Sequence, residues 1–165
     1  MPGEISDPIV LAASLVLFAA LAALAIIDWR TYRLPDAITL PLIAAGIGAA
    51  FLLGRPVLLH LAGAAAGYFA FVAIEMSYRR LRGRDGLGRG DAKLLAAGGA
   101  WCSVAALPVI VLIASFTALC CVVVLRLTGR SIDGMTMLAF GPFLALAIGL
   151  VWAIQRLVPG FPLFL

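Results

Sequence analysis

Two aspartates, Asp28 and Asp91, are the residues of this chain whose type and setting could do chemistry. Asp91 lies in the stretch 86–93, which reads GLGRGDAK, and Asp28 follows the first apolar segment. The first five residues of that stretch include three glycines, which let the backbone bend tightly and approach another segment closely. Two carboxylates that lie close together in a medium of low dielectric constant can share a proton. One then activates a water molecule while the other donates to a carbonyl oxygen, which is aspartic-protease chemistry and needs neither metal nor cofactor.

Each aspartate also has a structural interpretation. Asp91 could cap the helix that follows it, and Asp28 could be an interfacial charge paired with an arginine such as Arg30. Carboxylates at or near a membrane are nevertheless candidates for function. A nucleotide-binding loop is excluded, because Asp91 stands where the third glycine of GxGxxG would fall and no GK[ST] sequence follows.

The composition places these aspartates in a membrane protein. Hydrophobic residues make up 64% of the 165 residues, charged residues make up 12%, and the mean hydropathy is +1.15. Soluble domains are typically about 45–50% apolar and about 25% charged. The net charge of +4 does not indicate a nucleic-acid partner, because the charges fall in short connections between apolar segments.

Six apolar segments predict an all-α, polytopic protein with about six transmembrane helices, forming one membrane-embedded domain over residues 1–165. A membrane span needs about 20 mostly apolar residues. Pro35 disfavours helix in the residue before it, and Asp36 is expected to cap the second helix. Glycines and alanines in the second to fourth segments are expected to allow close helix packing. The expected helices cover residues 8–27, 37–53, 57–78, 92–107, 108–127 and 135–157.

The basic residues predict the orientation of these helices. The connections after the first, third and fifth helices, counting residues at their edges, hold ten of the twelve basic residues, so these connections are expected in the cytoplasm and both termini outside. Asp28 and Asp91 would then lie at the same cytoplasmic level. The ten residues are Arg30, Arg33, Arg79, Arg80, Arg82, Arg84, Arg89, Lys93, Arg126 and Arg130.

No metal site and no cofactor are expected. The chain has one histidine, His60, and its three cysteines, Cys102, Cys120 and Cys121, form no CxxC pair. The helix ends also predict which aspartate is ionised. Asp28 would end a helix, where the dipole is negative, and Asp91 would begin one close to Lys93, so Asp91 is expected to be the carboxylate and Asp28 the protonated acid.

The ordered motifs resemble the type IV prepilin peptidases, which are membrane aspartic proteases of the GxGD class. The likeness extends from about residue 27 to residue 145. GxGD alone is a weak signal, whereas the ordered set at matching membrane positions is specific. The motifs are Asp28, then 34–36 (LPD), 39–42 (TLPL), 82–87 (RGRDGL), 88–95 (GRGDAKLL), 98–101 (GGAW) and 140–143 (FGPF).

This resemblance implies that Asp28 and Asp91 are the catalytic pair, supported by the loop residues Gly88, Gly90, Lys93, Pro35 and Asp36. It implies cleavage of prepilin or pseudopilin leaders at the cytoplasmic face of the bacterial inner membrane. Larger members of the family also methylate the new N-terminus and carry an N-terminal region with paired CxxC motifs. That region is not in this sequence, so the chain is expected to be a short form and methyltransferase activity is in doubt.

Two other functions remain open at this stage. The aspartates could be relay groups in a small proton-coupled transporter, or the protein could be a non-catalytic membrane component of pilus assembly. A relay would spread carboxylates through the bilayer, whereas the middle of these apolar segments has none. The substrate's identity and the oligomeric state do not follow from the sequence.

Overall fold

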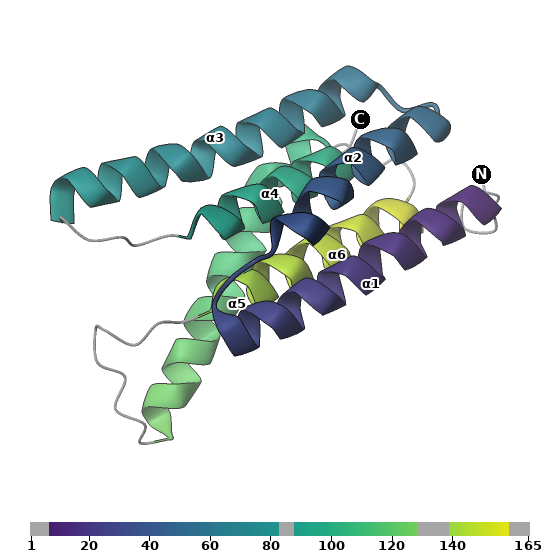
Figure 1. Ribbon diagram of the computed structural model, residues 1–165. Coiled ribbons are helices and arrows are strands. Elements are labelled where there is room, and N and C mark those ends of the chain that lie inside the picture. Colours follow the sequence, from purple (N-terminus) through teal and green to yellow (C-terminus); the bar gives the residue numbers. More distant parts are fainter. Residues whose placement is uncertain (1–6, 83–87, 129–138, 159–165) are drawn as a thin grey trace.

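The computed structural model describes residues 7–82, 88–128 and 139–158, and regular structure in this part of the chain is entirely helical. Figure 1 shows α1 and α6 side by side, with α4 beneath the long helix α3 and α5 running off steeply. The predicted all-α fold is confirmed, and each α-helix corresponds to one expected segment. The elements are α1 (Pro8–Thr31), α2 (Asp36–Leu52), α3 (Val57–Arg82), α4 (Arg89–Cys102), a 3-10 turn η1 (Val104–Ala106), α5 (Leu107–Leu127) and α6 (Gly141–Leu157).

Within the described ranges, three segments are long and apolar enough to cross a membrane: Pro8–Thr31, Val57–Leu81 and Val104–Leu127. Helices α2 and α6 are apolar but have 17 residues each, and α4 has 14. At 1.5 Å per residue, α4 is only about 21 Å long, against a hydrocarbon core of about 30 Å. It is shorter than the expected segment 92–107 because the chain leaves the helix at Ser103, whose φ is +73°.

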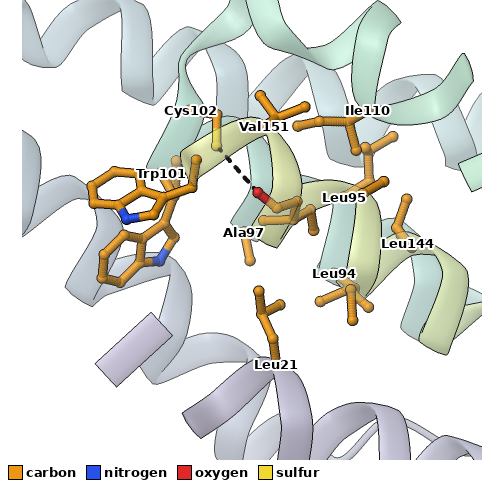
Figure 2. Packing of buried hydrophobic residues seen from close by; sticks show 14 of the residues in the cluster. Leu21, Leu94, Leu95, Ala97, Trp101, Cys102, Ile110, Leu144 and Val151 are labelled. Carbon is orange, nitrogen blue, oxygen red and sulfur yellow. Dashed lines mark hydrogen bonds between the residues drawn. The ribbon is translucent and has the colours of Figure 1, made fainter. Parts of the chain in front are cut away.

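Helix α4 forms the centre of the packing. Every residue from Leu94 to Cys102 is buried, because α2, α3, α5 and α6 all pack against α4. A helix that is apolar on all sides belongs inside a bundle. Figure 2 shows its side chains meeting Leu21 of α1, Leu144 of α6 and Ile110 of α5.

Two tryptophans join α4 to the surrounding helices. The indole N–H of Trp101 donates to the carbonyl of Leu42 at 2.8 Å, and the Trp101 ring meets the Trp152 ring edge to face, with centroids 5.2 Å apart. Trp152 in turn donates to Ser14 Oγ at 3.0 Å. Because each buried indole N–H has an acceptor, these rings contribute burial without an unsatisfied donor.

Glycines bring α3 and α4 into backbone contact. A Cβ on Gly63 would lie 2.5 Å from the carbonyl oxygen of Gly99, and one on Gly67 would lie 2.7 Å from the carbonyl oxygen of Leu95. Side chains are therefore excluded from this seam, as at close helix crossings in membranes. The expected close packing of glycine-containing segments is confirmed for α3 and α4.

Substituting Gly63→Ala should destabilise the protein by about 1–3 kcal/mol, because the new methyl group meets backbone that cannot rotate away. The matched control is Gly48→Ala in α2, since a Cβ there has nothing within 4 Å. That control should be neutral or more stable by up to about 1 kcal/mol. Thermal unfolding of both purified variants in detergent measures the difference, and equal stabilities would contradict the packing described.

Candidate active site

Two helix ends line one cavity, and the start of a third helix contacts one of its lining residues. The last turn of α1 contributes Asp28, the first turn of α4 contributes Asp91, and the first residue of α6, Gly141, contacts Asp28. Asp28 and Asp91, 63 positions apart in the sequence, both line a cavity of about 310 Å³. The structure therefore brings to one cavity the two aspartates that were expected at the same membrane level. The other lining residues are Tyr32, Arg33, Leu34, Gly88, Arg89, Gly90 and Lys93.

Asp28 is buried, with only 5% of its surface exposed. The sequence predicted that α1 ends at Asp28, but the helix continues to Thr31. Its C-cap residue is Tyr32, which lies in the left-handed region (φ 52°). The Asp28 carbonyl accepts the Tyr32 N–H at 2.8 Å. Its carboxylate turns away from α1, and Oδ2 accepts the backbone N–H of Gly141 at 3.0 Å.

Gly141 is the site residue whose role sequence reasoning missed. It was noted only as part of the FGPF motif, in a helix expected to start at residue 135. Residues 135–138 lie outside the described part of the chain, Ala139 and Phe140 are not helical, and α6 begins at Gly141. The Gly141-Pro142 pair was the available signal, because proline is favoured in the first turn of a helix.

Asp91 lies in the first turn of α4, one turn from Gly88, which is the N-cap residue. Asp91 is therefore not the cap itself. Burial raises the pKa of Asp91 to about 7, the negative charge of Asp28 adds to the rise, and a hydrogen bond with the Gly88 backbone opposes it. Asp91 precedes the expected fourth apolar segment and lies outside the three helices long enough to span a membrane. Near neutral pH the protonated and ionised forms of Asp91 are therefore both populated.

A pKa of about 7 argues against the expectation that Asp91 is fully ionised near neutral pH. The N-terminal position of Asp91 does favour its anion, but burial and the charge of Asp28 outweigh that effect. Lys93, expected to support an ionised Asp91, instead forms an ion pair with Asp36. Asp28 begins the last turn of α1 and is not its final residue, and its carboxylate faces the positive end of α6.

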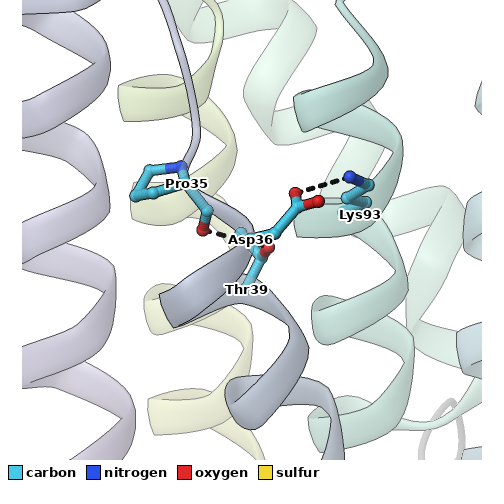
Figure 3. Close-up of polar contacts among 4 residues, drawn as sticks. All are labelled: Pro35, Asp36, Thr39 and Lys93. Carbon is cyan, nitrogen blue, oxygen red and sulfur yellow. Dashed lines mark hydrogen bonds and ion pairs between the residues drawn. The ribbon is translucent and has the colours of Figure 1, made fainter.

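The start of α2 is joined to α4 through Asp36. Pro35, not Asp36, is the N-cap residue of α2, so the predicted cap was wrong. Figure 3 shows the Asp36 carboxylate directed from the start of α2 to Lys93 on α4, which holds these two helix ends together. Thr39 Oγ1 donates to the carbonyl oxygen of Pro35 at 3.2 Å and closes the first turn.

The two glycines nearest Asp91 have different roles. A Cβ on Gly90 would lie 2.9 Å from Cβ of Leu34, so glycine lets α4 approach the loop between α1 and α2. Gly88 supplies the carbonyl that accepts the Asp91 N–H at 3.0 Å. Between them, Arg89 reaches Glu75 of α3, with Nε and Oε1 3.7 Å apart. The loop therefore joins α4 to its neighbours as well as carrying Asp91.

The residues considered for metal binding do not gather at this cavity. Among the described residues, no group of three or more His, Cys, Asp or Glu side chains could hold a metal ion. His60 Nδ1 is 2.8 Å from the carbonyl oxygen of Ala100, and Cys102 is buried in the core beside α6. These two residues are structural in this arrangement.

Comparison with known proteins identifies relatives. Residues 15–123 match the family described as the type IV leader peptidase family. The chain is 45% identical over 143 residues to the prepilin leader peptidase/N-methyltransferase of Dickeya chrysanthemi, covering 84% of this chain and 50% of that protein. It is 42% identical over 141 residues to the Escherichia coli K12 protein of the same name, covering 84% and 61%. No solved structure matches the chain.

The pKa of Asp91 should be visible as the titration of a protonated carboxyl group by infrared spectroscopy. In the intact protein the Asp91 component should lose half its intensity near pH 7. In Asp28→Asn the loss should move to lower pH, because a negative charge that raises the pKa is gone. Asp7→Asn, at the opposite end of α1, should change nothing. Loss of the Asp91 band near pH 4, the ordinary carboxyl pKa of about 4, would contradict the electrostatic coupling of the two aspartates. The same titration midpoint in Asp28→Asn as in the parent protein would also contradict it.

Proposed function

Because the chain belongs to the type IV leader peptidase family, we propose that it is an aspartic endopeptidase that removes the leader from type IV prepilins or pseudopilins. The observation that carries the proposal is that Asp28 and Asp91 line the same cavity and are electrostatically coupled. One carboxylate can activate a water molecule while a protonated carboxyl group polarises the scissile carbonyl. These are the two tasks of peptide hydrolysis.

The relatives' names give two activities, leader peptidase and N-methyltransferase, and the site of this chain does not support both equally. The chain spans about half the length of the curated relatives it matches, so their whole activities are not carried over directly. The paired carboxylates give a physical basis for hydrolysis. Methyl transfer would need a binding site for the methyl donor. The cavity at Asp28 and Asp91 gives no reason to propose such a site. The proposal is therefore the peptidase activity.

The position of the site suits a substrate that enters from the membrane surface. Asp28 lies in the last turn of α1, a helix long enough to span the bilayer, so the cavity opens at the level where α1 ends. Arg33, Arg89 and Lys93 line it as well. The distribution of basic residues in the whole sequence supports a cytoplasmic position for this level, which in a bacterial inner membrane is the face where leader cleavage is proposed.

The placement of carboxylates favours a peptidase over a proton relay. In the described part of the chain, Asp28, Asp36, Glu75 and Asp91 gather at one end of the bundle, joined by the contacts Asp36–Lys93 and Glu75–Arg89. Asp7 caps the opposite end of α1. A relay across the membrane needs titratable groups between the two ends.

Asp28→Asn and Asp91→Asn should each abolish leader removal while the protein stays folded and in the membrane. The double variant should be no worse than either single one, because the two groups act as a unit. The assay is co-expression with a prepilin in cells that lack their own leader peptidase, read as the mobility shift on processing. Asp7→Asn is the matched control and should process normally. Substantial processing by either single variant would rule out the pair.

The proposed orientation is tested by labelling single cysteines with a membrane-impermeant thiol reagent. Cys102, Cys120 and Cys121 are first replaced by serine. Arg33→Cys, between α1 and α2, should then react only from the cytoplasmic side, and Arg55→Cys, between α2 and α3, only from the opposite side. Reaction of both positions from the same side would defeat the proposed topology.

A further inference from the structure

We propose that Gly141 is a positioning residue that holds Asp28 as the ionised member of the pair, so that Asp28 is the general base and Asp91 the general acid. This inference rests on the proposed peptidase function and adds the division of roles. It gives the FGPF motif in α6 a part in the chemistry, although this motif is 113 residues from Asp28 in the sequence.

The contact has the geometry of a charge-stabilising hydrogen bond. Gly141 is the first residue of α6, where backbone N–H groups have no partner within the helix and the helix dipole is positive. Its N–H donates to Asp28 Oδ2 at 3.0 Å. Asp28 is 95% buried, so protein groups must replace the water that would otherwise stabilise its ionised carboxylate. An N–H hydrogen bond to an ionised acceptor is stronger than one to a neutral acceptor.

Only glycine leaves room for this contact. A Cβ at position 141 would lie 2.5 Å from Oδ2 of Asp28, 2.9 Å from its Cγ and 3.1 Å from its Cβ. A side chain would therefore push the carboxylate away or displace the start of α6. The absence of a side chain at this position is what lets the helix N-terminus approach Asp28.

The charged groups around the pair favour a proton on Asp91 over a proton on Asp28. Asp91 on α4 and Asp28 on α1 face one cavity, which Tyr32, Arg33, Arg89 and Lys93 also line. Lys93 is engaged by Asp36 and Arg89 by Glu75, so the cations beside Asp91 along α4 are drawn to other carboxylates. The first turn of α6 carries no acidic residue. The charge of Asp28 and burial together keep Asp91 protonated up to about pH 7.

The proton transfers close into a cycle. The Asp28 carboxylate takes a proton from water as the water oxygen bonds to the scissile carbonyl carbon, and Asp91 gives its proton to the carbonyl oxygen. The resulting gem-diol returns one hydroxyl proton to Asp91 while Asp28 protonates the leaving nitrogen and the C–N bond breaks. The products are a carboxylic acid and an amine, and both aspartates regain their starting states.

The test is the pH dependence of kcat/KM for prepilin cleavage. Its acidic limb reports the group that must be ionised, here Asp28 within the coupled pair, and its basic limb near pH 7 reports loss of the Asp91 proton. Replacing Gly141 by glycolic acid turns the amide into an ester, which removes the N–H without adding atoms. Because a hydrogen bond to a charged group is lost, the acidic limb should move to higher pH by about 1 or more.

Gly141→Ala, compared with the control Gly48→Ala, is the second variant. Gly141→Ala should lower kcat by about tenfold or more, since it displaces a reacting carboxylate, and Gly48→Ala should match the parent. Movement of the basic limb alone in the ester variant, or limbs identical to the parent, would overturn the assignment of roles. Failure of the parent protein itself to cleave prepilin would instead refute the proposed function, so the two failures are distinguishable.

Discussion

The hydrogen bond from the Gly141 N–H to Asp28 is the contact on which the site depends. It places a buried carboxylate against the positive end of a helix, and it links the last turn of α1 to the first residue of α6. A carboxylate buried to this degree would otherwise be unfavourable. The same contact joins the end of α1 to the start of α6, which also pack against each other along their length.

Helix α4 supplies the second half of the site and the core of the bundle together. Its first turn carries Asp91 and reaches α2 and α3 through Lys93 and Arg89, while residues from Leu94 onward are enclosed by neighbouring helices. Gly63, Gly67 and Gly99 let α3 lie against it backbone to backbone. A helix held on all sides is a rigid support, and a catalytic pair needs its carboxylates fixed relative to each other.

Sequence reasoning predicted the helices and selected both aspartates as candidates, because these features have local signals. Apolar length predicts helices, charge distribution places helix ends at one level, and the glycines around Asp91 distinguish that loop from a simple connection. The contacts that decide the chemistry are not local. Gly141 meets Asp28 across 113 residues, Lys93 meets Asp36 across 57, and the end of α1 lies beyond Asp28. The expected ionisation of Asp91 rested on helix dipoles and on Lys93. Burial and the charge of Asp28 instead raise the pKa of Asp91 to about 7, and Lys93 pairs with Asp36.

Peptide-bond hydrolysis is proposed to occur at the cavity between the end of α1 and the start of α4. The most direct measurement of that claim is mass spectrometry of a prepilin incubated with the purified protein in lipid vesicles. The account predicts a single cut that separates the leader from the mature chain, with the intact leader and the new N-terminus both recovered. An unchanged prepilin after prolonged incubation with correctly folded protein would contradict it.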